Sequence, residues 1–191
     1  MFVFDEELSL LFDRMKKLGA DLEHMQADGS LNLKIQQVDA AELSPGEFAH
    51  LVRSMVDTAH VKTVVIDSLN GYAAAMPDEK ALILHVHELL QYLNRQAANT
   101  FLTVAQHGIL GDMKAPVDIT YLADTVILLR YFEALGSVNR AVSIIKKRSG
   151  GHETTIREFS ISTTGLRLGE PLTEFQGILK GYPVAKTRSA T

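Results

Sequence analysis

Acidic side chains follow two of the apolar runs in this sequence, at places where they could bind a metal ion or activate water. Asp67 comes directly after the strand-like run 61–66. Glu6 and Glu7 come after the short apolar run 2–4. Because ligands of open α/β sheets bind at the carboxyl ends of the strands, these carboxylates would share one edge of the sheet. Asp67 is a candidate magnesium ligand, directly or through water, and Glu6 and Glu7 are candidates to orient or deprotonate a water that attacks a γ-phosphate.

Each of these carboxylates also has a structural interpretation. An aspartate after a strand can cap the next segment, and acidic residues in the first turn of a helix are stabilised by the helix dipole. Taken singly, Glu6 and Glu7 fit the helix interpretation better. Two acidic strand ends in one chain shift the balance towards a functional site.

Cations after residue 145 could bind an anionic ligand such as a phosphate. Lys146 and Arg148 project from the same face of the predicted strand 139–148, because side chains alternate along a strand. A glycine turn and His152 follow, and charge-assisted hydrogen bonds from such groups suit phosphate oxygens. A solvated strand end is the alternative interpretation.

Continuous apolar strands and amphipathic helices alternate over the first hundred residues. Strand patterns end at Asp67 and at Gln106, and a helix pattern that opens at Pro77-Asp78 separates them. The motif Ser44-Pro45-Gly46-Glu47 combines an N-cap serine, a proline at the first helical position and a glutamate three residues on, so it predicts a helix start. The alternating run 31–35 predicts a further strand. Together these patterns predict an α/β fold with a mostly parallel sheet and helices on both faces.

Gln106 is a fourth candidate site residue because it ends a buried strand. Its side-chain amide could sense a phosphate by hydrogen bonding. The chain changes character after it: strand patterns at 124–133, 139–148 and 156–162 have short connections and predict an antiparallel extension. We therefore expect one domain over residues 1–180 and a flexible C-terminal tail over 181–191.

The composition limits the compartment and the partners. The chain has 191 residues, a net charge of −4 and no cysteine, so it offers neither overall attraction to nucleic acid or anionic membranes nor thiol chemistry. Its apolar runs are far shorter than the ~20 residues that span a bilayer, and its first residues show no secretory signal. We expect a soluble, cytoplasmic protein whose partners are neither nucleic acid nor membrane.

Taken together, these segments resemble the KaiC-like branch of the RecA-type P-loop ATPases, which includes circadian clock proteins. The resemblance covers nearly the whole chain, and its three longest motifs are Val64-Val65-Ile66-Asp67-Ser68-Leu69-Asn70-Gly71, Leu122-Ala123-Asp124-Thr125-Val126-Ile127-Leu128-Leu129 and Ile145-Lys146-Lys147-Arg148-Ser149-Gly150-Gly151-His152-Glu153. It implies a RecA-like sheet, ATP and Mg²⁺ as cofactors, and a homo-oligomer with ATP between its subunits.

The resemblance also implies a role for each candidate residue. Glu6 and Glu7 match the paired catalytic glutamates of that family, and Asp67 matches its Walker B aspartate. The remaining matches are residues that reach the nucleotide held by the neighbouring subunit of a ring: Lys146, Arg148 and His152. The family's clock members phosphorylate themselves on adjacent Ser and Thr, where this chain has Thr120-Tyr121, so we do not expect clock-type autophosphorylation.

The sequence departs from the family at its phosphate-binding loop. The motif Gly-x-x-x-x-Gly-Lys-Ser/Thr is absent, and with it the strand before the loop and the helix after it. The segment 181–187 resembles the motif by chance, since it lacks the second glycine. Because this loop cradles the phosphates with backbone N–H groups, we expect the chain alone to bind ATP weakly or not at all.

The missing strand belongs between the strand ending at Gln106 and the one beginning near Asp124. Its loss would leave two sheet edges with unpaired N–H and C=O groups, which is costly. We expect the gap to be closed by rearrangement of the sheet or by a strand from another protomer, in a ring or a strand-exchanged dimer. The alternative is that these residues are a fragment of a longer gene product.

Two other functions remain open. The chain could be a non-catalytic assembly or regulatory module of the same family, with a signalling protein as a candidate partner. It could also be related to the RadA- and RecA-like DNA recombination proteins. The segment 107–117, where a DNA-binding loop would fall, has one lysine and no aromatic residue, so it provides poorly for phosphate contacts or base stacking.

Overall fold

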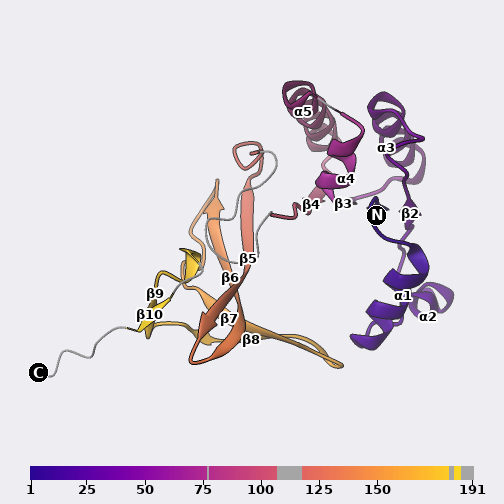
Figure 1. Cartoon of the computed structure of the whole chain (residues 1–191). Coiled ribbons are helices and arrows are strands. Elements are labelled where there is room, and N and C mark those ends of the chain that lie inside the picture. The colour runs from indigo at the N-terminus through magenta and orange to yellow at the C-terminus, as the bar shows by residue number, and fades with distance from the viewer. Residues whose placement is uncertain (77, 107–117, 181–182, 186–191) are drawn as a thin grey trace, which may run out of the picture. The chain divides into compact units, whose positions relative to one another are not determined.

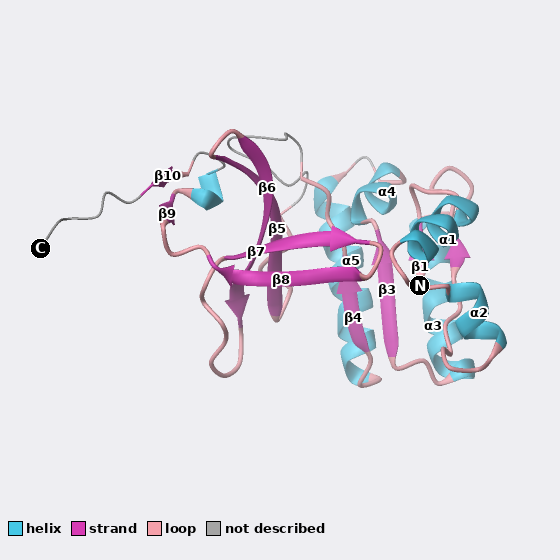
Figure 2. Cartoon of the chain, turned by 90° about the horizontal axis from the view of Figure 1, so that it is seen from below, coloured by secondary structure: helices cyan, strands magenta, loops and turns pink. Residues whose placement is uncertain are grey.

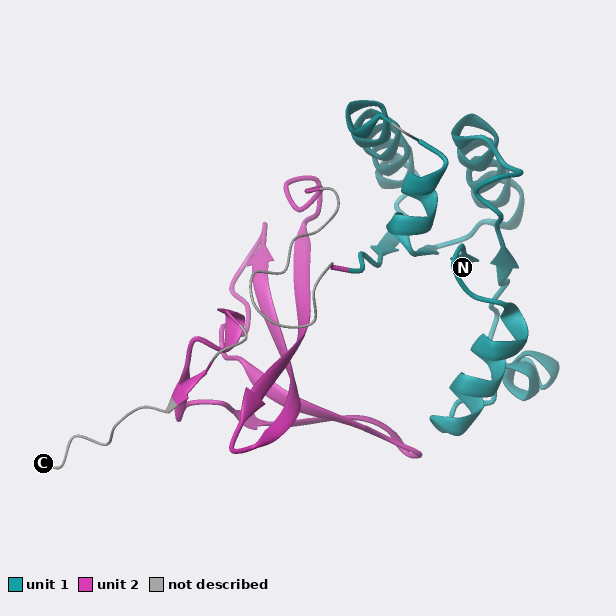
Figure 3. Cartoon of the chain, in the orientation of Figure 1, with its two compact units in different colours: residues 1–105 teal, residues 106–191 magenta. Residues whose placement is uncertain are grey.

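A computed structural model describes residues 1–76, 78–106, 118–180 and 183–185 of the chain. These residues form two compact units, 1–105 and 106–191, which are coloured separately in Figure 3. In the described parts of the chain, no helix is long and apolar enough to cross a membrane.

The first unit contains a four-stranded parallel sheet in the order β2-β1-β3-β4. Its strands are β1 (Phe2–Val3), β2 (Gln36–Gln37), β3 (Thr63–Asp67) and β4 (Asn99–Leu102). All neighbouring strands run parallel, with Phe2 opposite Ile66 and Val65 opposite Phe101. The predicted parallel sheet is thus confirmed, and the carboxyl ends of β1, β3 and β4 meet at one edge.

Helices cover both faces of this sheet, as predicted. Figure 1 shows α3 (Pro45–Ala59) and α5 (Glu79–Arg95) on one face, and α1 (Leu8–Lys17) and α2 (Leu22–Ala27) on the other. A short helix, α4 (Leu69–Ala74), directly follows β3.

Two of these helix starts follow from their sequences. The hydroxyl of Ser44 accepts a hydrogen bond from the amide of Glu47 at 3.3 Å, and the Glu47 carboxylate accepts one from the Ser44 amide at 2.9 Å, so the predicted capping box is confirmed. Asp78 caps α5 by accepting hydrogen bonds from the amides of Lys80 and Ala81.

An aromatic cluster fixes the chain where it leaves β1. Phe48 of α3 contacts Phe2 and Phe4 with ring centroids 5.2 Å away in both pairs, and it lies 4.9 Å from the ring of Tyr72 in α4. Burial raises the pKa of the Tyr72 phenol to about 12. The cluster thereby attaches α3 and α4 to the strand end that carries the first acidic residues.

The second unit is antiparallel, which confirms the predicted extension. Its main sheet has the order β5-β6-β7-β8, formed by β5 (Thr125–Ala134), β6 (Ser137–Lys147), β7 (Arg157–Ser162) and β8 (Gly165–Pro171). Figure 2 shows β7 and β8 side by side as a two-stranded ribbon.

A small core lies on one side of this antiparallel sheet. Phe132 and Ala141 are buried there together with Ile178 of a 3₁₀ turn, η1 (Ile178–Lys180), and Phe175 packs against them. Phe175 belongs to β9 (Phe175–Gln176), which pairs with β10 (Val184–Ala185). The strand β10 falls inside the segment 181–191 that was expected to be a tail; the other residues of that segment except Pro183 lie outside the described chain.

Each main sheet has an edge strand with large exposed apolar side chains. In the described residues, β4 is one edge of the parallel sheet and β5 is one edge of the antiparallel sheet. Phe101 of β4 is 58% exposed, and Ile127 and Leu129 of β5 are 58% and 57% exposed. These are the two edges between which the family's missing strand was expected.

Candidate functional site

The residues after β3 connect the ends of three strands. Asp67 ends β3, and the hydroxyl of Thr103, just after β4, donates a 2.6 Å hydrogen bond to its Oδ1. The backbone amide of Phe4, just after β1, donates to the carbonyl of Asp67 at 2.8 Å. Asp67 is therefore held at the carboxyl edge of the sheet, with one carboxylate oxygen fixed by a neighbouring strand.

Asp5 is the acidic residue after β1 that contacts this segment. Its Oδ2 accepts a 2.6 Å hydrogen bond from the hydroxyl of Ser68. Gly71 makes the approach possible, because a Cβ at that position would lie 2.6 Å from Oδ1 of Asp5 and 2.4 Å from Cβ of Phe4. Asp5 was not among the residues predicted from the sequence, although it is the first carboxylate after the apolar run 2–4.

Glu6 and Glu7 make different contacts from Asp5. The carboxylate of Glu6 forms an ion pair with Arg14 of α1. Glu7 is exposed and is the N-cap residue of α1, where its carbonyl accepts from the amide of Leu11 at 3.1 Å. The structure thus places Glu6 and Glu7 at the start of α1, beside Asp5 in sequence.

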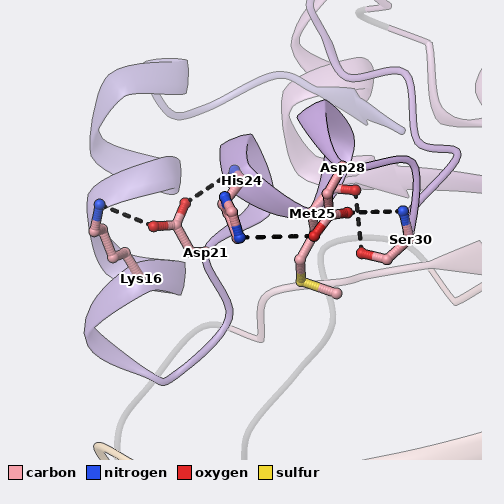
Figure 4. Close-up of polar contacts among 6 residues, drawn as sticks. All are labelled: Lys16, Asp21, His24, Met25, Asp28 and Ser30. Carbon is pink, nitrogen blue, oxygen red and sulfur yellow. Dashed lines mark hydrogen bonds and ion pairs between the residues drawn. The ribbon is translucent and has the colours of Figure 1, made fainter.

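A polar network holds α1 to α2 through their connection (Figure 4). Lys16 pairs with Asp21 at 2.9 Å, and Asp21 also caps α2 by accepting from the amide of His24 at 3.2 Å. Asp28 accepts from the amide of Ser30 at 2.8 Å. The hydrogen bond from Lys16 lowers the pKa of the Asp21 carboxyl, and the hydrogen bonds from Ser30 lower that of Asp28. This network is structural and supports the helix that carries Arg14.

The structure brings Lys146 and Arg148 together on one turn of their own unit. The ammonium of Lys146 donates to the carbonyl of Thr120 at 2.8 Å. The guanidinium of Arg148 donates to the carbonyl of Tyr121 at 3.1 Å and pairs with Asp124 at 2.9 Å. Both cations therefore have partners, and they fix the turn that precedes β5.

Two further candidates lie in segments that follow strands. The predicted strand end at Gln106 was wrong, because β4 ends at Leu102, where its ladder with β3 closes. His152 is half-buried in the segment after β6. Gln106 is the first residue of the second unit, and its side-chain oxygen is enclosed without a hydrogen-bond partner among the described residues. A buried acceptor without a partner is uncommon in folded proteins, so the position of the Gln106 side chain needs a physical reason.

The donors at the edge of the parallel sheet fit a magnesium ion. Thr103 occupies one oxygen of Asp67, and the other can face a metal or a metal-bound water. In the described part of the chain, no group of three or more His, Cys, Asp or Glu side chains could hold a metal ion. Magnesium fits such a site because it needs only one or two protein carboxylates and completes its shell with water and phosphate.

The phosphate side of an ATP site fits less well. Nothing in the 191-residue sequence matches the glycine–lysine loop whose amides cradle phosphates. The sequence thus contains carboxylates and hydrogen-bonding groups that suit a metal ion, but no such phosphate-binding loop.

Comparisons with known proteins agree with this architecture. The family described as "ATPase: KaiC" matches residues 1–173. The circadian clock protein KaiC3 of Synechocystis is 26% identical over 192 residues, which cover 99% of this chain and 37% of that protein. The circadian clock oscillator protein KaiC of Acaryochloris marina is 26% identical over 184 residues, covering 96% of this chain and 35% of that protein.

A solved structure shows the same fold. A KaiC-like protein of the hyperthermophilic archaeon Pyrococcus horikoshii OT3 superimposes with a TM-score of 0.71 at 24% identity, covering 88% of this chain and 74% of its own. This chain spans a little over a third of the length of the curated relatives above. Since the family match extends over most of the chain, the protein belongs to the KaiC family of RecA-type ATPases.

Proposed function

We propose that this chain supplies the metal and water side of an ATP site in a KaiC-type ATPase whose complete form hydrolyses ATP between subunits. The single observation that supports the proposal most is the position of Asp67 beside Asp5, each carboxylate being held by a hydroxyl from a neighbouring segment. When bound, Mg²⁺ would neutralise charge on the phosphates.

In this proposal Asp67 is the Walker B residue and would hold Mg²⁺, directly or through water. Thr103 orients the Asp67 carboxylate, since it donates to Oδ1 of Asp67 at 2.6 Å. Asp5 joins Glu6 and Glu7 as a candidate to orient or deprotonate the attacking water, and it is the one of the three that contacts the segment after β3. Gln106 is the proposed phosphate sensor.

Lys146, Arg148 and His152 are proposed to face the nucleotide of a neighbouring subunit. The carbonyl contacts of Lys146 and Arg148 do not use up their donors, because an ammonium has three N–H groups and a guanidinium has five. The bonds to the turn at Thr120 and Tyr121 would hold both cations in place before an anion arrives, which lowers the entropy cost of binding.

A non-catalytic regulatory module of the family is the second candidate function. The observation that favours it is the absence of the glycine–lysine loop from this sequence. On either proposal, the chain alone binds ATP weakly.

Titration with Mg²⁺ alone, followed by ¹⁵N-resolved NMR of the 191-residue chain, tests the metal side. We expect shifts centred on Asp67, Thr103 and Asp5, with a millimolar dissociation constant, and we expect Asp67→Asn to abolish them. Asp57→Asn is the matched control, since Asp57 lies on α3 and accepts the Tyr92 hydroxyl instead. Identical Mg²⁺ shifts in Asp67→Asn and the parent would contradict the metal role.

Equilibrium binding of radiolabelled ATP in the presence of Mg²⁺ tests the phosphate side. Without the cradle, we expect a dissociation constant on the order of 1 mM or weaker, since most of the phosphate contacts are missing. Micromolar binding by this chain would show that it holds the nucleotide by other means, and the proposal of an incomplete site would fail.

A further inference from the structure

The side chain of Asn70 bonds to both backbone groups of a single residue in a distant segment. Its Nδ2 donates to the carbonyl of Ala105 at 3.0 Å, and its Oδ1 accepts from the amide of Ala105 at 2.8 Å. At neutral pH a carboxamide offers a donor and an acceptor side by side in this way, whereas an ionised carboxylate has acceptors only. The pair therefore depends on the asparagine itself and not on polarity alone.

This pair continues the contact between β3 and β4 beyond the end of their ladder. The ladder closes with Ile66 opposite Leu102, and the amide of Leu69 then donates to the carbonyl of Thr103 at 2.9 Å. From Ser68 onward the backbone turns into α4 and can no longer pair as a strand. Asn70 takes the place of the departing backbone, so the segment 103–105 stays attached to the residues after β3.

The attachment ends directly before the proposed phosphate sensor. The carbonyl of Ala105, the nitrogen of Gln106 and the Cα of Gln106 lie in one planar peptide group. A hydrogen bond that fixes the carbonyl of Ala105 therefore fixes the direction in which Gln106 leaves the sheet. Among the described residues, the side-chain oxygen of Gln106 is enclosed without a hydrogen-bond partner, which has a free-energy cost.

We infer that Asn70 is a positioning residue: it sets the backbone at Ala105 and thereby the placement of Gln106 as sensor. The Thr103 hydroxyl on Asp67 and the Asn70 amide on Ala105 act as two successive cross-links between the same two segments. The metal ligand and the residue before the sensor are thus held by one short stretch of chain, 67–70. The sensing role of Gln106 in this inference rests on the proposed function; its positioning by Asn70 does not.

Asn70→Ala removes the amide and tests the positioning directly by NMR on the full chain. We expect the Ala105 backbone amide to exchange with solvent at least about tenfold faster and the side-chain amide signals of Gln106 to shift. Asn94→Ala, which truncates an exposed asparagine of α5, is the matched control and should change neither signal.

Asn70→Asp adds a pH-dependent rescue that a general loss of structure would not show. At neutral pH the introduced carboxylate has acceptors only, so it loses the bond to the Ala105 carbonyl and places negative charge against it. Protonation restores one donor beside one acceptor. The Gln106 side-chain signals should therefore return towards those of the parent, recorded at the same pH, as the pH falls through the pKa of the introduced carboxyl.

Two outcomes would overturn the inference. One is Gln106 signals in Asn70→Ala that match the parent while the Ala105 amide exchanges faster, since Asn70 would then only brace the sheet. The other is Gln106 side-chain signals in Asn70→Asp that do not return towards those of the parent as the pH falls. Failure of the Mg²⁺ titration with the Gln106 shifts present would remove the proposed function and support the positioning, so the two failures are distinguishable.

Discussion

At the scale of single residues, the candidate site depends on close contacts that a pattern of residue types does not reveal. Asp5 reaches the segment after β3 only because Gly71 has no side chain, and its carboxylate is then fixed by Ser68. The sequence predicted acidic residues at the ends of β1 and β3, and carboxylates do lie there. It selected Glu6 and Glu7 and not Asp5, because the direction in which each residue leaves a two-residue strand is set by packing and not by residue type.

The close approach at Gly71 predicts different effects for two glycine substitutions. Gly71→Ala would place a Cβ against Phe4 and Asp5, and we expect it to lower the free energy of unfolding by about 1–3 kcal/mol. Gly46→Ala in the first turn of α3 meets no atom within 4 Å, and we expect it to be neutral or to stabilise by about 0.4–1 kcal/mol. Urea unfolding of both variants measures the difference. An equal effect of the two substitutions would show that Gly71 is not needed for the approach.

At the scale of elements, local signals predicted the helices better than the short strands. Ser44 caps α3 as predicted, and α5 begins after Asp78, where the helix was predicted to open, because such signals depend on neighbours within one turn. The strand predicted over 31–35 was wrong: β2 is Gln36–Gln37. Its position follows from pairing with β1, with Gln36 opposite Phe2, so a distant strand overrides the local alternation of apolar residues.

The capping box of α3 predicts a specific loss of stability that depends on pH. Ser44→Ala removes the N-cap hydroxyl, and such substitutions cost about 1 kcal/mol. The hydrogen bonds from Ser44 lower the pKa of the Glu47 carboxyl in the folded state. The contribution of the Glu47 carboxylate to stability is therefore complete above the ordinary pKa of a glutamate. It is lost as the pH falls through the lowered pKa of Glu47 in the folded state.

Thermal unfolding of the Ser44→Ala variant and its parent between about pH 7 and pH 3 measures this dependence. We expect the difference in stability between the two to shrink towards acid pH, because protonated Glu47 no longer favours the cap. Ser54→Ala, on the exposed face of the same helix, should show no such trend. A difference that stays constant with pH would mean that the two halves of the box act independently.

At the scale of the whole molecule, the main sheet of each unit has an edge strand that pairs with no further strand among the described residues. β4 and β5 carry Phe101, Ile127 and Leu129, which are more than half exposed, and in the described chain neither strand has a neighbour on its outer side. Long apolar edges of this kind favour pairing with another strand, and natural proteins usually protect them with charge, proline or a bulge. These two edges were expected from the absence of the glycine–lysine motif, but the sequence could not show how they are covered.

We predict that the isolated chain self-associates through β5, because no further strand of the described chain pairs with this edge. Ten residues, Thr125–Ala134, form this strand, and a strand from another copy would pair its backbone and cover the side chains of Ile127 and Leu129. Sedimentation velocity should therefore give a mass above that of one chain, decreasing on dilution.

Leu129→Lys places a charge on the edge and should shift the chain towards the monomer. Leu84→Lys is the matched control, since Leu84 is 58% exposed but lies on α5, and it should leave the mass unchanged. A parent chain that sediments as a monomer at every concentration would show that the edge is not used for pairing, whereas equal effects of the two lysines would assign the association to general hydrophobicity.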